Sequence, residues 1–339
     1  MEQELRHLKQ ELALISDESK TYFKLILQQL SRIAHLNPND KYLKLLSSNL
    51  QEYADSIDVF QPYHNYPKVC LFGSARTSAN TLLYQLSESI SKQLSDAGFM
   101  IITGAGPGIM EAGNKGAQDQ GFGLNILLPF EQESNPFIRD SDKLVSYKYF
   151  FLRKLMFVKE SQATVLFPGG FGTFDEAFEL LTLIQTGRTS PRPIVLFDEP
   201  GSIYWKRWIE LFYEQLLDTH YISKDDLLLF QHFQSITPAV NYIQTFYRVY
   251  HSIRYLDDYS IIYLNCTLSL DFVASLNEQF SHILTEGHFS YHKADHNPCP
   301  LDSTSPTPCL TFSFDKKQFS TLVLLIDALN KFDSSPRNS

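Results

Sequence analysis

The stretch that decides the fold is ATVLFPGGFGTFDEAFELLTLIQTG, residues 163–187. Its first five residues, Ala163–Phe167, are apolar and partly β-branched, a pattern that predicts a buried parallel strand. A glycine-rich turn, Pro168–Gly172, follows, and an amphipathic helix is predicted to begin at Thr173. A strand, a bare glycine turn and a helix N-terminus together form a cradle for an anion. Free backbone amides and the positive end of the helix dipole point to the same place there.

Glu176 follows the glycine turn closely and lies in the first turn of the predicted helix. A phosphate-bearing ligand next to a carboxylate is therefore the chemistry that this stretch indicates. Thr173 and Glu176 also have the T-x-x-E spacing of a capping box, in which the glutamate only closes the helix N-terminus. Capping and catalysis remain equally open for Glu176, and one side chain can do both.

The composition is that of a globular protein. The chain has 339 residues, of which 43% are hydrophobic and 20% charged, enough for one large domain with appendages or for two domains. No apolar run approaches a membrane span, and the charged, periodic N-terminus is unlike a secretory signal. The net charge of −9 argues against a general nucleic-acid-binding surface. The four cysteines form no CxxC pair, which predicts a reduced, cytoplasmic protein.

Strands and helices alternate through the middle of the chain. Apolar runs and helical periodicity predict strands at 68–72, 99–103, 122–128, 163–167 and 193–197, and helices at 81–97, 109–120, 148–160, from 173 onward and at 203–217. This alternation predicts an α/β fold, a Rossmann-like doubly wound parallel sheet with helices on both faces. Ligands bind at the carboxyl ends of the strands in such sheets. Glycine-bearing turns follow Phe72, Thr103 and Phe167, so all three turns are expected at that edge.

Two further segments flank this domain. Residues 1–60 have helical periodicity without a strand signal, and their apolar faces are expected to pack on the main domain or on a second subunit. After about Tyr250 the pattern becomes strand, helix, polar loop, strand and helix, at 260–265, 268–283, 284–308, 309–314 and 316–332. The sequence thus predicts an N-terminal helical segment, 1–60, a nucleotide-binding catalytic domain, 61–250, and a small α+β appendage, 251–335.

Arg153 and Lys154 lie inside FFLRKLMFV, where every other residue is apolar. A helix of this composition is expected to be buried, so its cations need partners. One interpretation is a structural ion pair with Asp175 or Glu179. The other is that Arg153 points toward the glycine cradle and binds phosphate or ribose through its planar fork. We favour the second, because this helix directly precedes the strand that leads into the cradle.

Other cofactor and metal sites find little support in the sequence. The turn Gly104–Gly108 fails the dinucleotide fingerprint, because Ile109 occupies the third glycine position and no acidic residue ends the next strand. No Lys-Ser or Lys-Thr follows the glycines, so a Walker loop is absent. Five residues near the C-terminus have a spacing that matches no usual zinc site: His288, His292, His296, Cys299 and Cys309. We therefore predict no metal and no cofactor.

The segment Pro168–Glu176 matches the PGGxGTxxE motif of the LOG family, whose members were once labelled lysine decarboxylases. Arg153-Lys154 is similar to the paired Arg-Lys of the family, and the turns at 72–76 and 104–112 resemble its first two strand-end turns. The resemblance covers about residues 68–185. It implies a Rossmann-like fold and a nucleoside 5′-monophosphate phosphoribohydrolase, an N-glycosidase that releases free base and ribose 5-phosphate.

The resemblance also implies roles for individual residues. The catalytic pair of the family corresponds to Arg153 and Glu176, its substrate-contacting threonine to Thr182, and its acidic contact after the third strand to Glu131. With the glycine turns at the strand ends, the predicted substrate-binding residues are Gly73, Ser74, Arg76, Gly104, Gly106, Gly108, Glu131, Lys154, Gly169, Gly170, Phe171, Gly172, Thr173 and Thr182.

The flanking segments resemble those of longer bacterial members of the family rather than the short plant type. Ordinary purine or pyrimidine monophosphates therefore remain open beside cytokinin-type substrates. Family members usually form oligomers, so we expect a homodimer or a larger homo-oligomer. The expected binding partner is a small-molecule nucleotide substrate, and we expect no binding to nucleic acid or to a membrane. Two non-enzymatic alternatives remain open: a nucleotide-binding regulator or carrier that uses the cradle without turnover, and a carrier of the molybdenum cofactor.

Overall fold

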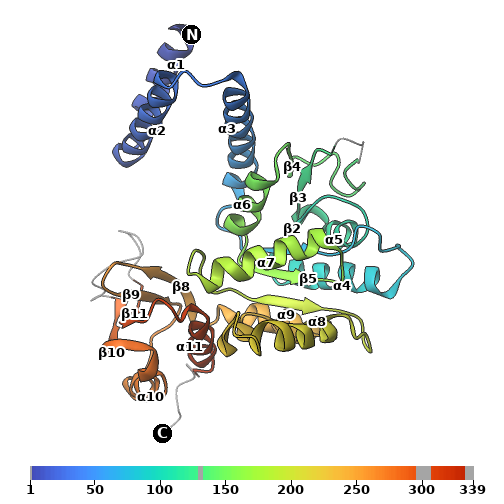
Figure 1. Ribbon diagram of the computed structural model, residues 1–339, viewed down its shortest axis with the longest axis vertical. Helices are drawn as coiled ribbons and strands as arrows, with labels where there is room; N and C mark the ends of the chain where they lie inside the picture. Colours follow the sequence, from blue (N-terminus) through green and yellow to red (C-terminus); the bar gives the residue numbers. More distant parts are fainter. Residues whose placement is uncertain (1, 129–132, 295–306, 333–339) are drawn as a thin grey trace. The chain divides into compact units, whose positions relative to one another are not determined.

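A computed structural model of the chain describes residues 2–128, 133–294 and 307–332 (Figure 1). The chain divides into two compact units, one up to Ala54 and one from Asp55 onward. The first unit is helical, as the sequence predicts. It holds α1 (Glu2–Leu14), α2 (Asp17–His35) and most of α3 (Asp40–Phe60).

The second unit contains a seven-stranded sheet in the order β4-β3-β2-β1-β5-β6-β7, in which every neighbouring pair is parallel. The strands are β1 (Lys68–Phe72), β2 (Met100–Thr103), β3 (Gly121–Ile126), β4 (Leu144–Tyr147), β5 (Ala163–Leu166), β6 (Ile194–Phe197) and β7 (Gln231–Phe233). The four central strands β1, β2, β5 and β6 are buried along their whole length, which is why their sequences are mainly apolar, with Lys68, Thr103 and Thr164 as the exceptions. The predicted Rossmann-like α/β fold is confirmed.

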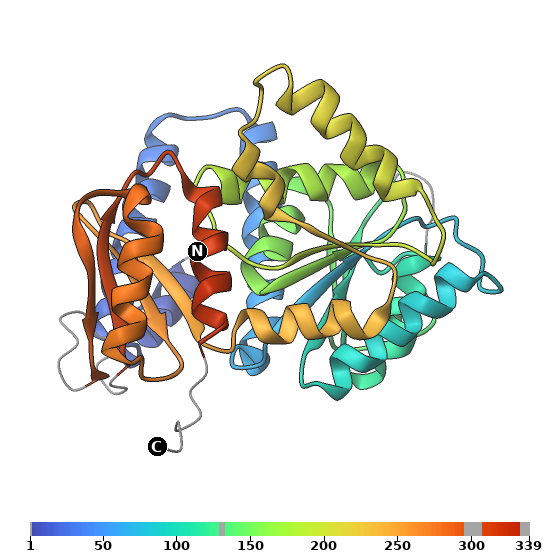
Figure 2. The ribbon, with the colours of Figure 1, turned by 90° about the horizontal axis from the view of Figure 1, so that it is seen from below.

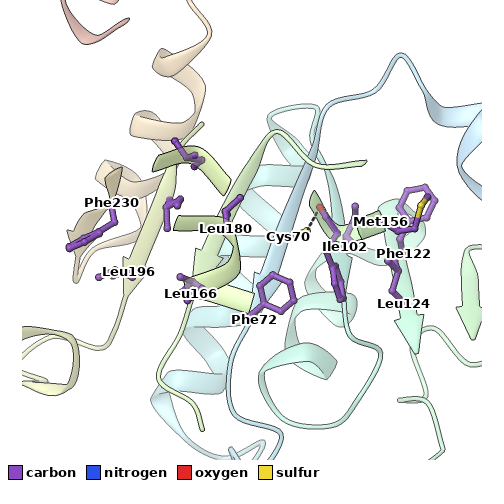
Figure 3. Close-up of a cluster of buried hydrophobic side chains, with 14 of the residues drawn as sticks. Cys70, Phe72, Ile102, Phe122, Leu124, Met156, Leu166, Leu180, Leu196 and Phe230 are labelled. Carbon is purple, nitrogen blue, oxygen red and sulfur yellow. Dashed lines mark hydrogen bonds between the residues drawn. The ribbon is translucent and has the colours of Figure 1, made fainter. Parts of the chain in front are cut away.

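Helices cover both faces of this sheet (Figure 2). They are α4 (Leu82–Asp96), α5 (Ile109–Ala117), α6 (Phe150–Glu160), α7 (Phe171–Gln185), α8 (Tyr204–Phe212) and α9 (Ile236–Phe246). Alternate residues of β1 divide between the two layers. Val69 and Leu71 pack with α4, α5 and α9, whereas Cys70 and Phe72 pack with α6, α7 and α8 (Figure 3). The sheet is therefore the middle layer of a three-layer domain, with a separate core on each face.

The strand order changes direction between β1 and β5. The chain moves from β1 outward to β4 and then returns to β5 on the other side of β1. Two backbone hydrogen bonds join the strand ends here: Phe167 donates to the Phe72 carbonyl at 2.8 Å, and Ser74 donates to the Pro168 carbonyl at 3.0 Å. Crevices at such a switch point are where ligands bind in open α/β sheets. The first-strand turn and the glycine cradle thus lie next to each other.

The C-terminal part of the second unit is a four-stranded antiparallel sheet in the order β10-β11-β9-β8, packed against two helices. Its elements are β8 (Tyr250–Tyr255), β9 (Ser260–Leu264), α10 (Leu270–Phe280), β10 (Leu284–His292), β11 (Cys309–Phe314) and α11 (Leu322–Asn330). The prediction that this segment has an α+β structure is confirmed. Its division from the main domain near residue 250, like the one at residue 60, remains our proposal.

One prediction in the appendage is wrong. The stretch from 284 was expected to be a polar loop, but Leu284–His292 is the strand β10, which pairs antiparallel with β11. It is an edge strand, and of its nine residues only Phe289 is buried, so an apolar run was not required. The sequence analysis also missed β4, β7, β8 and α9. Both β4 and β7 are short edge strands of the parallel sheet, so they too need no apolar run that the sequence would reveal.

Candidate functional site

A cavity of about 1100 Å³ opens at the carboxyl ends of β1 and β5. Its walls come from the turn after β1, the turn after β5, and helices α6, α7 and α8. Ten of the predicted site residues line it: Gly73, Ser74, Arg76, Arg153, Gly169, Gly170, Phe171, Gly172, Thr173 and Glu176. The switch point of the sheet and the glycine turn therefore share one cavity with the two predicted catalytic residues, Arg153 and Glu176.

The capping-box interpretation of Glu176 is wrong. Helix α7 begins at Phe171 with Gly170 as its N-cap, two residues earlier than predicted, and no side chain caps it. Thr173 is thus already inside the helix, and Glu176 lies in its second turn. The early start was hidden because glycine is a poor helix former, so Gly172 read as part of a turn. Glu176 consequently has no capping task at the helix N-terminus.

The glycine turn leaves the start of α7 open to the cavity. A β-carbon added to Gly170 or Gly172 would meet nothing within 4 Å, whereas one on Gly169 would lie 2.1 Å from Oγ1 of Thr173. The Tyr204 hydroxyl donates to the Gly169 carbonyl at 2.6 Å and accepts from its N–H at 3.2 Å. Tyr204 therefore holds the turn in place from α8, a contact that sequence analysis missed because it links distant parts of the chain.

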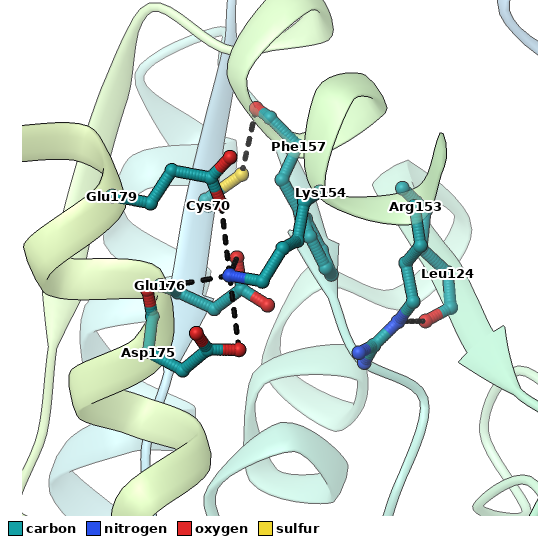
Figure 4. Close-up of polar contacts among 8 residues, drawn as sticks. All are labelled: Cys70, Leu124, Arg153, Lys154, Phe157, Asp175, Glu176 and Glu179. Atoms are coloured by element: carbon teal, nitrogen blue, oxygen red, sulfur yellow. Dashed lines mark hydrogen bonds and ion pairs between the residues drawn. The ribbon is translucent and has the colours of Figure 1, made fainter. Parts of the chain in front are cut away.

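Arg153 lies against the second glycine turn. Its Nε donates to the Leu124 carbonyl at 2.7 Å, and a β-carbon on Gly104 would lie 2.6 Å from its Nη2 (Figure 4). A side chain at position 104 would therefore displace the guanidinium of Arg153 and the sulfur of Met110, which lies 2.8 Å from the same β-carbon position. Burial lowers the pKa of Arg153, and the charge of Glu176 opposes this. Among the described residues, its two terminal nitrogens have no hydrogen-bond partner, although Arg153 lines the cavity.

The ion pair that the sequence suggested for this helix is made by Lys154 rather than by Arg153. The Lys154 Nζ lies 2.8 Å from Glu179, 3.0 Å from Asp175 and 3.3 Å from Glu176 (Figure 4). Burial alone would lower the pKa of Lys154, but hydrogen bonds to Glu179 and Asp175 outweigh it and raise the pKa. Lys154 is not among the residues that line the cavity. It faces the carboxylates of α7 from behind the site.

Glu176 is a buried carboxylate with two cations near it. Its side chain is only 8% exposed, and burial raises its pKa while the charges of Lys154 and Arg153 partly lower it again. The net effect is a pKa above that of an ordinary glutamate. A perturbed carboxyl group in a cavity is the usual sign of a group that takes part in chemistry. Among the acids of α7, Glu176 has this environment because it faces both α6 and the switch point.

The remaining glycines shape the backbone rather than line the cavity. Gly108 is the N-cap of α5 with φ +69°, and a β-carbon there would lie 2.4 Å from the Ser74 carbonyl oxygen. Ile109 donates to that same carbonyl at 3.1 Å, which joins the first two turns. The Gly106 carbonyl accepts from the side chain of Asn135 at 3.1 Å. Gly104, Gly106 and Gly108 thus support Ser74 and Arg153 from behind.

Thr182, a further predicted substrate contact, does not line the cavity. Thr182 lies further along α7, donates to the Phe178 carbonyl at 2.7 Å, and lines a separate small pocket of about 110 Å³. Glu131 lies outside the described residues. The cavity is lined instead by residues that sequence analysis did not single out, among them Thr77, Leu83, Met110, Phe150 and Trp208. The aromatic run YWKRW at 204–208 is the one sequence signal for this wall.

The histidine and cysteine residues near the C-terminus do not form a metal site in the part that is described. His292 Nε2 lies 2.9 Å from Oγ1 of Thr311, whereas His296 and Cys299 fall outside the described residues. Within residues 2–128, 133–294 and 307–332, no group of three His, Cys, Asp or Glu side chains could hold a metal ion. In the same residues no helix has the length and apolar character that crossing a membrane requires.

Comparison with known proteins gives the following matches. Residues 107–243 match the family model described as possible lysine decarboxylase. A cytokinin riboside 5′-monophosphate phosphoribohydrolase of Arabidopsis thaliana is 22% identical over 154 residues, which are 45% of this chain and 67% of that protein. The Mycobacterium tuberculosis protein of the same name is 36% identical over 85 residues. These residues are 25% of this chain and 43%, less than half, of that protein.

Among solved structures, the molybdenum cofactor carrier protein of Chlamydomonas reinhardtii matches with a TM-score of 0.37 and 20% identity. The match covers 53% of this chain and 96% of that one. The family-model match, residues 107–243, falls on the parallel-sheet domain and includes the glycine turn, Arg153 and Glu176, which meet at one cavity. The parallel-sheet domain of this chain is therefore similar to the family described as possible lysine decarboxylase and to two proteins named cytokinin riboside 5′-monophosphate phosphoribohydrolase.

Proposed function

We propose that the chain hydrolyses the N-glycosidic bond of nucleoside 5′-monophosphates and releases free base and ribose 5-phosphate. One observation carries the proposal: the buried Glu176 carboxylate, the unpartnered terminal nitrogens of Arg153 and the open N-terminus of α7 line the same cavity. The names of the two curated relatives support the reaction class. The base, AMP-like or cytokinin-type, and a homo-oligomeric state belong to the proposal.

The reaction needs an anion close to the anomeric carbon. Loss of a base from ribose passes through an oxocarbenium-like state, in which positive charge develops on the sugar. The Glu176 carboxylate stabilises that charge and accepts a proton from the attacking water. The water oxygen bonds to C1′, the C1′–N bond breaks, and the base leaves with a proton. Glu176 suits this task because its raised pKa makes it a better base than an ordinary glutamate.

The phosphate supplies binding energy away from the reacting bond. Backbone amides at the start of α7 and the guanidinium of Arg153 bind the phosphate, which fixes the sugar beside Glu176. Binding energy from a non-reacting group then lowers the barrier through orientation. A phosphate and a carboxylate in one cavity repel each other, so Arg153 and Lys154 also keep Glu176 ionised when substrate is bound.

A panel of nucleoside monophosphates tests the proposal. AMP, GMP, CMP, UMP and N6-substituted AMP are each incubated with the full chain, and the products are separated by chromatography. Free base and ribose 5-phosphate are expected from at least one of them. Intact nucleotide throughout the panel, together with saturable binding of AMP, would instead favour the nucleotide carrier that the sequence left open.

Replacing Lys154 by methionine is expected to move the acid limb of the pH–activity profile to higher pH. The Lys154 charge lowers the pKa of Glu176, because a nearby opposite charge favours the ionised carboxylate. Without it Glu176 stays protonated to higher pH and is inactive as a base. Lys159→Met is the matched control, since Lys159 lies on the same helix but pairs with Glu160. An unmoved acid limb in Lys154→Met would contradict this account.

Replacing Gly104 by alanine is expected to lower kcat/KM about 10–100-fold with little loss of stability. The new β-carbon would lie 2.6 Å from Nη2 of Arg153, so the guanidinium must move away, and small misplacements in a site are costly. Gly172→Ala is the comparison, because its β-carbon meets nothing within 4 Å. Steady-state kinetics and thermal melts of both variants check this. Full activity in Gly104→Ala would show that the position of Arg153 is unimportant.

A further inference from the structure

The cavity extends beyond the space that a nucleoside monophosphate needs. Its volume of about 1100 Å³ exceeds the roughly 300–1,000 Å³ of pockets that enclose a drug-sized ligand. It is lined both by Phe150 and Arg153 of α6 and by Tyr204 and Trp208 of α8, although α7 lies between these helices in the sheet-covering layer. The cavity therefore passes around the N-terminus of α7 and has a part on each side of that helix.

The two sides of α7 differ in chemistry. The acids Asp175, Glu176 and Glu179 face α6, where Lys154 binds all three. Phe174 and Phe178 are each two residues from Glu176, which places them about 200° around the helix. The ring of Phe174 lies 4.2 Å from that of Trp208 and 5.8 Å from that of Phe178, between centroids. The α8 side is therefore aromatic, whereas the α6 side has the charged groups of Arg153 and Glu176 together with the ring of Phe150.

Four rings joined by ring–ring contacts line the cavity on the α8 side: Phe174, Phe178, Tyr204 and Trp208, here called the aromatic compartment. Phe178 is 42% exposed, and Phe171, at the start of α7, is 96% exposed and lines the same cavity. The Tyr204 hydroxyl is already occupied by both backbone groups of Gly169. The compartment thus offers ring surfaces for stacking beside the open amides of Gly170 and Gly172.

We propose that the aromatic compartment binds a second nucleoside esterified to the 5′-phosphate, so that the preferred substrate is a dinucleotide. The inference rests on the proposed function. The reacting C1′ must lie beside Glu176, which places its ribose and base on the α6 side. The phosphate then lies at the start of α7, between the two parts of the cavity. A second ester on that phosphate leads into the aromatic compartment, where its base stacks.

The chemistry is the same hydrolysis with a different leaving product. Water adds to C1′ of the 5′-linked nucleoside, the C1′–N bond breaks, and the base departs with a proton. The other product is ribose 5-phosphate still esterified to the second nucleoside. Stacking on rings tolerates any base, because every base has a π face. The compartment therefore selects for the presence of a second base and not for its identity.

Three substrates test the proposal: AMP, the methyl ester of AMP, and the dinucleotide adenylyl-(3′→5′)-adenosine. The methyl ester is the matched control, because it has a phosphodiester without a second ring. We expect kcat/KM for the dinucleotide to exceed that for the methyl ester about tenfold or more, the usual effect of stacking one base on aromatic side chains. A dinucleotide no better than the methyl ester overturns the proposal.

Trp208→Leu links any preference to the compartment. This variant is expected to reduce the ratio of dinucleotide to methyl-ester kcat/KM toward one, whereas Tyr213→Leu is expected to retain it. Tyr213 is an exposed aromatic residue directly after α8 that does not line the cavity. A ratio that survives Trp208→Leu, with thermal melts showing a folded protein, refutes the assignment. AMP cleaved without a dinucleotide preference leaves the proposed function standing, whereas failure to cleave any of the three, together with intact nucleotide throughout the monophosphate panel, refutes both.

Discussion

Glu176→Gln is expected to lower kcat for nucleoside monophosphates by about 10²–10⁴-fold, the usual loss when a general base is removed. Glutamine has the same shape but carries no charge, so it cannot stabilise the oxocarbenium-like state or accept the proton from water. Binding of AMP is expected to persist, since the α7 amides and Arg153 remain. Single-turnover kinetics and calorimetric titration with AMP separate the two effects.

The matched control for this variant is Glu179→Gln. Glu179 lies one turn further along α7 and shares Lys154 with Glu176, but it does not line the cavity. It is expected to retain most of the activity. Equal losses in the two variants would mean that the acids of α7 matter only through Lys154, and the assignment of Glu176 would fall.

The substitution Glu176→Gln also has a predictable effect on the thermal stability of the protein. The folded pKa of Glu176 is raised, so its ionised form is less favourable in the folded state than in the unfolded state. The wild-type chain therefore loses stability as pH rises from the unfolded pKa through the folded pKa. Glu176→Gln avoids that loss and is expected to melt at an equal or higher temperature than wild type at pH 7, with the gain absent at acidic pH. Thermal melts across this range check the sign.

Arg153→Lys is expected to lower kcat/KM for nucleotides by about 10²–10³-fold, as when a preorganised donor to substrate is removed. One ammonium group cannot donate to the Leu124 carbonyl and also reach the phosphate, whereas the guanidinium has donors for both. The loss is expected for nucleoside monophosphates and much smaller for the slow reaction of nucleosides, which lack phosphate. Comparing AMP with adenosine measures this difference.

A second substitution separates the fork of Arg153 from its charge. Arg153→Met removes both, and because the Arg153 charge lowers the pKa of Glu176, it is also expected to move the acid limb of activity upward. Arg153→Lys is expected to leave that limb in place. Arg207→Lys, at an exposed position on α8, is the control for the substitution itself. An equal loss on AMP and adenosine would show that Arg153 does not act through the phosphate.

The sequence predicted the parallel-sheet domain well where strands are buried on both faces. β1, β2, β5 and β6 are buried at every position and are mainly apolar, so they are easily recognised in the sequence. β4, β7 and β10 lie at sheet edges and are only partly buried, so their sequences need no apolar run. Sequence periodicity reports burial, and it is weakest where burial is incomplete.

Within the site, local sequence identified the cradle but not the direction of each side chain. Adjacent residues on a helix point about 100° apart, and only the packing of α6 decided that Lys154 meets the acids while Arg153 meets Gly104. The start of α7 was misplaced because two glycines lie in and before its first turn. Tyr204 and Trp208 were missed because their contacts cross from α8 to α7, and no local pattern records such contacts.

The sequence by itself determined the layer order of the fold, the family resemblance and the glycine turn at a helix N-terminus. These properties depend on the spacing of apolar residues and on the backbone freedom of glycine, and residues that are close together in the sequence determine both. Only the tertiary structure decided which cation meets which acid, that Arg153 packs against Gly104, and that aromatic residues of α7 and α8 line the same cavity as Arg153 and Glu176. Those properties depend on distances between residues far apart in the chain, and only the packing of α6, α7 and α8 on the sheet determines them.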